Sequence, residues 1–492
     1  MNKTENTVDI DNIHKKTANA TKWSTISEII AKLIVPITNM VLARLLTPES
    51  FGVVATVNMI VSFSDMFSDA GFQKYLIQHD FKNKKVLDEH TNVAFWTNFT
   101  ISIIIWIIIC IFCKPISIAV GNPGLEKVII VASASLPLTS FSSIQMARFK
   151  REFNFKVLVP IRFISVIISF CVTIPLAFAF HSYWALIIST IIGNLINALL
   201  LTIKSEWKPR FYYNFSILKE MFIYSWWILL ESISFWATTY IDTFIVGCFL
   251  SIYYVGLYKT AMSTVNQIMG LITAATSLPL FVALSRLKNN KIALEKTYLE
   301  YIRAISCFII PMGVGIWFYR SLVVQILLGN QWTEATTFVG LWGLIYAISI
   351  VWGSYCNSLY NAVGKTYLSF LSQILQLIVL VPVLIFFVKR GYQSLFIARS
   401  FIRLEIIFVQ FFIMRIVMKI RVIDQIKMVI PASFCSIIMV IVAMILRNIL
   451  SDSIYWQCFS VLICIAVYFI IMNLFFKRIF IDTMILLGLK KQ

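Results

Sequence analysis

The chain contains a succession of apolar stretches, each long enough to cross a lipid bilayer as a single helix. A transmembrane helix needs about 20 mostly apolar residues. Applied along the sequence, this criterion predicts about fourteen spans. In order, they cover roughly residues 22–44, 51–73, 91–113, 127–147, 157–179, 182–203, 221–247, 254–281, 299–319, 335–359, 366–388, 394–416, 428–448 and 454–476. The connections between them are short, so we expect no separate extramembrane domain.

The composition indicates that lipid is the solvent of this fold. Hydrophobic residues make up 59% of the 492 and charged residues only 13%, whereas an ordinary globular domain has about 45–50% and about 25%. A soluble fold of this size could not bury so much apolar surface. The composition therefore excludes a soluble enzyme, a disordered protein and a disulfide scaffold, and predicts an all-α polytopic membrane protein.

The basic residues predict the orientation of the spans. The chain has 42 Lys and Arg against 23 Asp and Glu, a net charge of +19. Most of the 42 lie in the N-terminal tail, in the loops after the even-numbered spans and in the C-terminal tail. Cytoplasmic loops carry such an excess, so we expect both termini in the cytoplasm. Topology and anionic lipid headgroups explain the positive charge, and no nucleic acid partner is expected.

Neither the cysteines nor the histidines are spaced as metal ligands. Cys110 and Cys113 form the one close cysteine pair, in an apolar setting that does not suit a redox pair. The four histidines are isolated along the sequence. We therefore expect no metal site, no catalytic residues and no cofactor.

A short internal repeat relates two parts of the chain. Leu46-Thr47 is followed by Phe51-Gly52-Val53, and six predicted spans later Leu250-Ser251 is followed by Val255-Gly256-Leu257. An even number of crossings returns the second copy in the same orientation, which is typical of a parallel repeat about an axis along the membrane normal. Spans 13 and 14 fall outside the repeat.

Four predicted spans carry polar or ionisable residues on one helical face, at steps of three, four or seven residues. These candidates are Glu28, Lys32 and Asn39 in span 1, Asn58, Asp65 and Asp69 in span 2, Glu231 and Asp242 in span 7, and Lys259 and Asn266 in span 8. An ionisable group at mid-membrane costs at least about 2.5–3.5 kcal/mol, so it normally faces a partner or a wet cavity. The simplest arrangement that satisfies all four faces is one cavity between two halves of the protein.

Some of these residues also have a purely structural interpretation. Glu28 and Lys32 stand at i and i+4 and could pair only with each other. Asp242, near the outer interface, could simply be solvated. Lys259 could extend to the outer headgroups.

Other ionisable residues complete the set of candidates. Asp65 and Asp69 are like charges on one face, which favours a cavity, and a proton held by one of them would suit coupling to H⁺. Arg162 in span 5 is followed by serines on the same face, and Arg399 and Arg403 are stacked in span 12. Arg403 could instead pair with Glu405 or with nearby carbonyls.

Several local motifs resemble those of one transporter family. The segment Leu42-Ala43-Arg44-Leu45-Leu46-Thr47-Pro48-Glu49-Ser50-Phe51-Gly52 resembles the ARLLxPxxFG signature of Wzx-type polysaccharide flippases of the MATE-like MOP superfamily, nearest the colanic acid and teichuronic acid exporters. Four further segments match the family. Met146–Lys156 is similar to its basic stretch between spans 4 and 5, and Val255–Ala261 is similar to its GxYxRA turn, with Lys259 in place of Arg. Leu328–Trp332 is similar to its LGxxW turn, and Gly364-Lys365 to its G-[RK] after span 10. The matches run from about residue 20 to residue 365.

The resemblance implies two six-helix bundles in a V shape around a central cavity, with a further helix pair beside them. Helices 1, 2, 7 and 8 would form most of that cavity, and these are the four spans with polar faces. The corresponding division gives residues 1–21 as an N-terminal tail, 22–212 and 213–420 as the two bundles, and 421–492 as the final two helices and the C-terminal tail.

The resemblance also implies a function. Such proteins flip an undecaprenyl-diphosphate-linked oligosaccharide across the bacterial inner membrane for export of a surface polysaccharide, such as O-antigen, capsule or exopolysaccharide. Lys32, Lys259 and Arg162 could meet the diphosphate. Membrane lipids, the lipid-linked oligosaccharide, and a polysaccharide polymerase with its export machinery would be the partners.

Two other functions remain as alternatives. A MATE-type drug or metabolite antiporter on the same scaffold, driven by Na⁺ or H⁺, should have an acidic cavity, whereas these spans mix acids with bases. A membrane glycosyltransferase or polymerase would need a large outer loop with catalytic residues, and the predicted outer loops are too short. We therefore expect a transporter rather than an enzyme.

Overall fold

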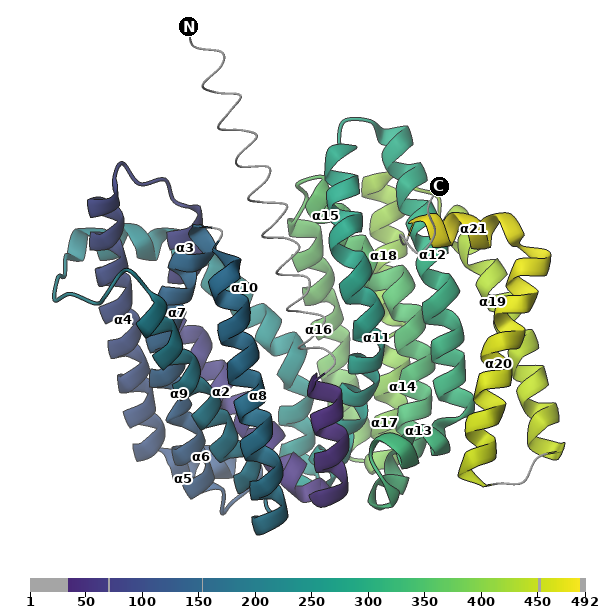
Figure 1. The fold of residues 1–492 in the computed structure, drawn as a ribbon, viewed down its shortest axis with the longest axis horizontal. Helices are drawn as coiled ribbons and strands as arrows, with labels where there is room; N and C mark the ends of the chain where they lie inside the picture. Colours follow the sequence, from purple (N-terminus) through teal and green to yellow (C-terminus); the bar gives the residue numbers. More distant parts are fainter. Residues whose placement is uncertain (1–33, 70, 153, 450–452, 487–492) are drawn as a thin grey trace, which may run out of the picture. The chain divides into compact units, whose positions relative to one another are not determined.

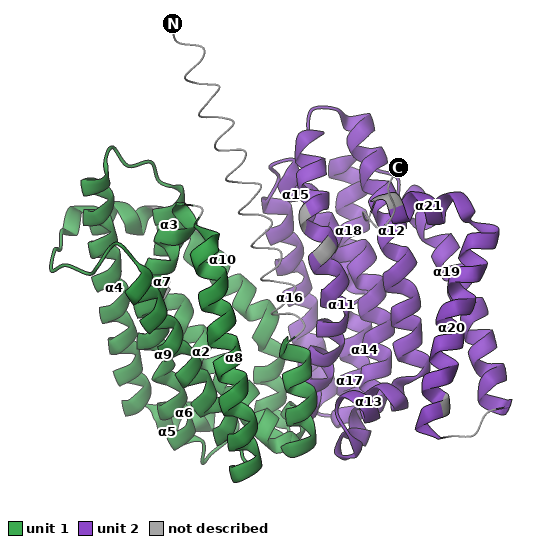
Figure 2. Ribbon diagram, in the orientation of Figure 1, with its two compact units in different colours: residues 1–256 green, residues 257–492 purple. Residues whose placement is uncertain are grey.

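The computed structural model describes residues 34–69, 71–152, 154–449 and 453–486, and this part of the chain is helical, without strands (Figure 1). Contacts divide the chain into two compact units, Met1–Gly256 and Leu257–Gln492 (Figure 2). An all-helical chain is expected in lipid, because a helix satisfies its own backbone hydrogen bonds where water is absent.

The first unit contains a helix over Ile34–Leu45 and nine further helices. These are α2 (Pro48–Asp69), α3 (Phe72–Gln78), α4 (Lys84–Ile111), α5 (Cys113–Ala119), α6 (Glu126–Ser133), α7 (Ser135–Arg151), α8 (Phe155–Phe180), α9 (Trp184–Lys204) and α10 (Phe215–Phe249). Helix α11 (Ile252–Arg286) begins in the first unit and continues in the second.

The second unit contains the rest of α11 and ten more α-helices, with three short helical segments of other types. The α-helices are α12 (Lys291–Phe318), α13 (Arg320–Leu327), α14 (Thr336–Ser349), α15 (Tyr355–Ala362), α16 (Tyr367–Val388), α17 (Tyr392–Ile402), α18 (Glu405–Ile413), α19 (Val422–Ile449), α20 (Ile454–Phe475) and α21 (Lys477–Leu486). The other segments are a 3₁₀ helix over Asn330–Ala335 and π-helical turns over Ile350–Ser354 and Met414–Met418.

Each span predicted from residue 51 onwards coincides with a helix or with a broken pair of helices. Span 4 is divided between α6 and α7, span 10 is interrupted by the π-helical turn over Ile350–Ser354, and span 12 is divided between α17 and α18. Within the described residues, ten helices are long and apolar enough to cross a membrane, or eleven if the bent α11 is included. The count of fourteen therefore remains a prediction.

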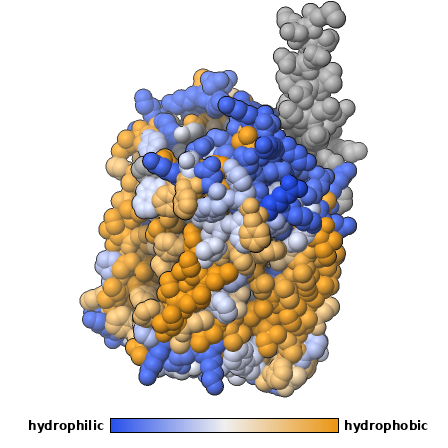
Figure 3. Space-filling view, turned by 90° about the vertical axis from the view of Figure 1, so that its left-hand side faces the viewer, coloured by the Kyte–Doolittle hydropathy of each residue, from blue (hydrophilic) through white to orange (hydrophobic). Residues whose placement is uncertain are grey.

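The surface of the protein matches a bilayer. Figure 3 shows an apolar band on one face, between hydrophilic regions at its two ends. Helix α4 contributes a row of exposed isoleucines to the lipid-facing surface, from Ile104 to Ile111. Such a large exposed apolar surface would aggregate in water, so the chain is a multi-pass membrane protein.

Polar contacts join the basic loops at one end of the first unit. The guanidinium of Arg151 donates to the carbonyl oxygens of Leu76 (2.8 Å) and His79, which ties the end of α7 to α3. The backbone N–H of Arg210, after α9, donates to Asn92 Oδ1 at 3.0 Å. The loops after spans 2, 4 and 6 therefore lie at the same end of this unit, as expected of loops on one side of a membrane.

Helix α10 packs in the first unit, although the sequence division places it in the second bundle. Its Trp236 indole N–H donates to the Met59 carbonyl at 3.1 Å, and its Tyr240 hydroxyl lies 3.1 Å from Ser62 Oγ on α2. The two compact units accordingly divide after Gly256, and the division into two six-helix bundles at residue 212 remains a prediction.

The two glycines of the sequence repeat pack directly against each other. A Cβ atom on Gly52 would collide with the carbonyl oxygen of Ile252, and one on Gly256 would collide with the carbonyl oxygen of Pro48. The Cβ of Gly256 would also lie 2.9 Å from the Gly52 nitrogen. The first turns of α2 and α11 therefore touch backbone to backbone, an approach that requires glycine at both positions.

We expect Gly256→Ala to destabilise the protein, because the added methyl group meets backbone atoms that cannot rotate away. The loss should be about 1–3 kcal/mol or more. Gly270→Ala is the matched control on the same helix, since its Cβ would have no neighbour within 4 Å, and it should be neutral or slightly stabilising. Thermal unfolding of the two purified variants in detergent measures the difference; equal melting temperatures would contradict the close packing.

Candidate functional site

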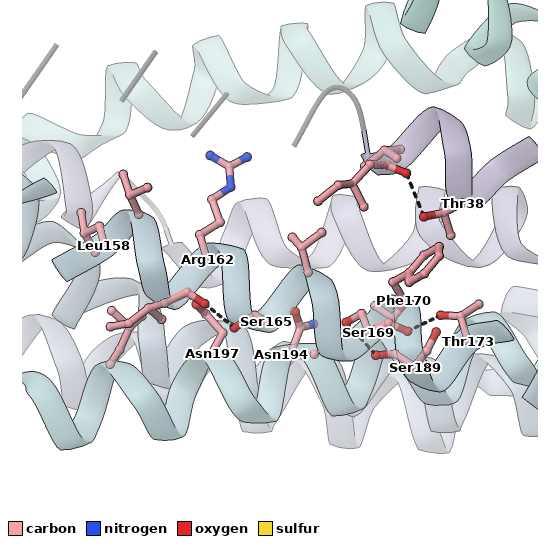
Figure 4. Close-up of a pocket in the computed structure, with 18 of the residues that line it drawn as sticks. Thr38, Leu158, Arg162, Ser165, Ser169, Phe170, Thr173, Ser189, Asn194 and Asn197 are labelled. Atoms are coloured by element: carbon pink, nitrogen blue, oxygen red, sulfur yellow. Dashed lines mark hydrogen bonds between the residues drawn. The ribbon is translucent and has the colours of Figure 1, made fainter. Parts of the chain in front are cut away.

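A cavity of about 800 Å³ lies within the first unit. Its walls are the helix Ile34–Leu45, the end of α7, and the facing sides of α8 and α9 (Figure 4). Lys150, in the last turn of α7, marks its basic end. The cavity is large enough to hold several sugar-sized groups or ordered waters, since ligand pockets measure about 300–1,000 Å³.

Small residues shape the floor of the cavity between α8 and α9. A Cβ on Gly193 would collide with the hydroxyl of Ser169, so the two helices approach closely there. Ser169 Oγ donates to the Ser189 carbonyl at 3.3 Å across the interface. Small residues at a helix interface are typical of membrane proteins, and here they leave the space that forms the cavity.

Four polar side chains that line this cavity have no hydrogen-bond or ion-pair partner among the described residues. They are Arg162 on α8, Asn194 and Asn197 on α9, and Asn39 on the first helix. Within the described part of the chain, no hydrogen bond or ion pair involves any of them. Figure 4 shows the Arg162 guanidinium pointing away from its helix, with Asn197 at the same level and Asn194 further along the cavity.

The described lining of the cavity carries basic residues but no acidic ones. Arg162 is exposed and sits about 10 Å along α8 from Phe155, at the helical rise of about 1.5 Å per residue. The described lining residues include Lys150 as well and contain no aspartate or glutamate. An unpaired cation and free amides in a membrane protein normally face water or a ligand. This arrangement suits an anionic ligand rich in hydrogen-bonding groups.

Helix α2 holds Asp65 in a structural contact. The Asp65 carboxylate accepts a hydrogen bond from Thr139 Oγ1 of α7 at 2.9 Å. Asn58, two turns earlier, is exposed. The side chain of Asp69 lies outside the described part of the structure, and so do Glu28 and Lys32.

The two candidate acids of α10, Glu231 and Asp242, lie in different environments. Glu231 is exposed and forms an ion pair with Lys74, at 3.1 Å. Asp242 is buried, with 1% of its surface exposed, and accepts hydrogen bonds from the backbone N–H (2.7 Å) and the hydroxyl (3.2 Å) of Thr243. The interpretation of Asp242 as a solvated interfacial carboxylate is therefore wrong, because packing around α10 excludes water from it.

In the second unit, the two stacked arginines lie on aromatic rings of α14. The Arg399 guanidinium is 4.9 Å from the Trp342 ring centroid, and that of Arg403 is 5.7 Å from the Tyr346 centroid. The two rings stack on each other at 5.5 Å. Arg399 is buried and its Nε donates to the Tyr258 hydroxyl at 2.9 Å. These contacts hold the buried guanidinium of Arg399 against α11 and α14.

The remaining candidates of the second unit lie on α11. Asn266 Oδ1 accepts a hydrogen bond from the indole N–H of Trp342, at 3.0 Å. Lys259 is half-buried. The structure thus places Arg162 and Asn39 in one cavity, whereas Asp65, Asn266 and Arg399 have partners on neighbouring helices.

Sequence reasoning missed the polar face of α9. Thr190, Asn194 and Asn197 stand at i, i+4 and i+7, the spacing that singled out the other four spans. The prediction that only four spans carry such a face is therefore wrong. The same periodicity test applied to span 6 finds these residues, which are polar but carry no charge.

The chain matches the model of a known family. The model of a family described as "Polysaccharide biosynthesis protein" matches residues 41–337. This range includes the whole cavity except its first wall residues, from Ile34 to Asn39.

Three curated proteins are similar to the chain. An uncharacterized membrane protein in the cps region of Klebsiella pneumoniae is 24% identical, over 75% of this chain and 76% of that protein. The succinoglycan biosynthesis transport protein ExoT of Rhizobium meliloti is 22% identical, over 65% of this chain and 64% of that protein. The lipopolysaccharide biosynthesis protein WzxC of Escherichia coli is 19% identical, over 76% of this chain and 75% of that protein.

Two solved structures share the fold. The lipid II flippase MurJ, in an inward closed conformation, superposes with a TM-score of 0.77 at 16% identity, covering 94% of this chain and all of MurJ. An inward-facing multidrug resistance MATE family transporter of the MOP superfamily gives 0.61 at 14% identity, covering 79% of this chain and 94% of that one. The chain therefore has the fold of MOP superfamily transporters.

We expect Arg399 to be needed for stability. Arg399→Ala removes a buried cation–π contact and a charged hydrogen bond, which should cost about 2 kcal/mol or more. Arg399→Lys should also destabilise, because an ammonium group cannot stack as a planar guanidinium does. Arg162→Ala is the control, and its unfolding temperature should match that of the wild type. Thermal unfolding in detergent makes the comparison; a stable Arg399→Ala variant would contradict the structural role.

Proposed function

The chain belongs to the polysaccharide biosynthesis protein family, and on that premise we propose that it flips an undecaprenyl-diphosphate-linked oligosaccharide across the bacterial cytoplasmic membrane. The names of two relatives refer to succinoglycan transport and lipopolysaccharide biosynthesis. The fold shared with a lipid II flippase supports the same reaction class. The exported product would be a surface polysaccharide.

The observation that carries this proposal is the cationic cavity of the first unit. A diphosphate and its sugars cannot cross hydrocarbon unaided, because they lose their hydration there. Arg162 presents five N–H donors in a planar group, a geometry that matches phosphate oxygens. Asn39, Asn194 and Asn197 offer both donors and acceptors to sugar hydroxyls. The lipid chain would remain in the bilayer while the headgroup occupies the cavity.

The transport step requires no bond making in this proposal. Alternating access would open the path first to the cytoplasmic leaflet and then to the outer one, as in population shifts between two conformations. Glu28, Lys32, Asn58, Asp69 and Lys259 remain candidates for the rest of this path. Coupling to H⁺ or Na⁺ through the acids of spans 1 and 2 is part of the same hypothesis.

The alternative is a cation-coupled drug antiporter, since a multidrug transporter shares the fold. The described lining of the cavity contains two basic residues and no carboxylate. An organic cation would be repelled by Arg162 and would find no counter-charge among the described lining residues. The charge of the cavity therefore favours an anionic headgroup over a cationic drug.

We expect Arg162→Gln to impair flipping strongly while leaving the amount of folded protein unchanged. Loss of a charged hydrogen bond to phosphate should cost about 1.5–3 kcal/mol, or about ten- to a hundredfold in transport rate. Arg162→Lys should retain part of the activity, because it keeps the charge without the planar geometry. The measurement is the leaflet distribution of the diphosphate-linked oligosaccharide in a strain that depends on this transporter.

Lys156→Gln is the matched control for Arg162→Gln. Lys156 is an exposed basic residue on the same helix, but it does not line the cavity. This variant should transport at the wild-type rate. Normal outer-leaflet delivery by Arg162→Gln would remove the cavity from the proposed path, and normal delivery in a strain without the protein or any redundant transporter would remove the proposed function itself.

We further propose that both termini lie in the cytoplasm and that the protein works beside a polysaccharide polymerase and its export machinery. The basic loops gathered at one end of the first unit support this orientation. A fluorescent protein fused to the C-terminus should then fluoresce, and alkaline phosphatase fused there should be inactive. Active phosphatase at the C-terminus would reverse the predicted topology.

A further inference from the structure

One face of α9 carries a row of polar groups along the cavity. Thr190, Asn194 and Asn197 are separated by four and three residues, so their side chains project from the same side of the helix. All three line the cavity. At about 1.5 Å per residue the row is about 10 Å long, a length suited to a disaccharide rather than to a single phosphate group.

The groups in this row are available for binding. Within the described residues, the side-chain amides of Asn194 and Asn197 make no hydrogen bond to the protein, so each offers two N–H donors and a carbonyl acceptor. Thr190 Oγ1 donates to the Leu186 carbonyl at 2.8 Å, which leaves its lone pairs free to accept. The row therefore presents donors and acceptors of the kind that sugar hydroxyl and acetamido groups require.

The facing wall of the cavity, on α8, is less able to discriminate between sugars. Ser165 Oγ donates to the Ile161 carbonyl at 2.9 Å, and Thr173 Oγ1 donates to the Ser169 carbonyl at 2.6 Å. Their protons are therefore already used within the helix. Val166 and Phe170, between them, are apolar. Apart from Arg162 on α8, the side-chain N–H groups that line this part of the cavity without a described hydrogen-bond partner belong to α9.

The charged and neutral groups are arranged in order along the cavity. Arg162 and Asn197 lie at one level of the cavity, and Asn194 lies about one helical turn further (Figure 4). Lys150, in the last turn of α7, also lines the cavity. In a lipid-linked oligosaccharide the diphosphate joins the lipid to the first sugar, so the diphosphate and that sugar are neighbours in the ligand. The order of side chains thus corresponds to the order of chemical groups in the ligand.

Resting on the proposed function, we propose that Thr190, Asn194 and Asn197 determine specificity for the sugars nearest the diphosphate, while Arg162 binds the diphosphate itself. A site that hydrogen-bonds the hydroxyl or amide groups of its ligand rejects analogues that leave those groups unpaired. Variation along this face of α9 would then change which oligosaccharide is accepted without changing the recognition of the diphosphate.

Binding to the purified full-length protein separates the two roles. The probes are the diphosphate-linked oligosaccharide lipid extracted from a transporter-deficient strain and undecaprenyl diphosphate without sugars. The variants are Asn194→Leu, Asn197→Leu and Arg162→Gln. Asn448→Leu is the matched control, since Asn448 is an exposed asparagine near the end of α19 in the second unit, outside this cavity. Unfolding temperatures establish that each variant is folded.

The wild type should bind the sugar-bearing lipid more tightly than the sugar-free one. Each α9 variant should reduce that preference about tenfold, the equivalent of one lost hydrogen bond, and leave the affinity for undecaprenyl diphosphate unchanged. Arg162→Gln should weaken binding of both lipids, and Asn448→Leu of neither.

Two results would overturn this inference in distinguishable ways. If the wild type binds both lipids equally, or if the α9 variants weaken the binding of both lipids to the same extent, the α9 row does not recognise the sugars. The proposed function would still stand. If the wild type binds neither lipid, the proposed function fails and the inference fails with it.

Discussion

In the hydrocarbon core of a membrane, a polar side chain must find a partner on the protein or reach water. This constraint divides the polar residues of the chain into two groups. Asp65, Asn266 and Arg399 are hydrogen-bonded to side chains of neighbouring helices. Arg162 and Asn194 line a cavity instead. The first group holds helices together, and the second provides the chemistry on which transport depends.

The arginines illustrate how the same residue type serves both purposes. Arg399 lies on the Trp342 ring and its Nε donates to the Tyr258 hydroxyl, so its guanidinium packs against neighbouring helices of the second unit. The described lining around Arg162 contains no counter-charge, and an anion from outside the protein can supply one. A cavity with this property would bind a phosphate ester and exclude an organic cation, which separates polysaccharide export from drug efflux on a shared fold.

Close backbone approaches shape both the packing and the cavity. Gly52 and Gly256, at equivalent positions of the repeat, bring the first turns of α2 and α11 into direct contact. Between α8 and α9, Gly193 instead leaves space for the side chain of Ser169. Because association in lipid gains little from the hydrophobic effect, such close contacts carry much of the packing energy. At Gly193 they also leave room for polar groups above the interface.

The sequence by itself determined that the chain is a multi-pass helical membrane protein, because long apolar runs have no other stable form in lipid. It located α16 almost to the residue, identified the family through a local motif, and selected Arg162 as a candidate. Only the tertiary structure decided that Asp242 is buried, that α10 packs with the first unit, and that Asn194 and Asn197 share a cavity with Arg162. Periodicity reveals which residues share one face of a helix, but the environment of that face depends on neighbouring helices that are distant in the chain.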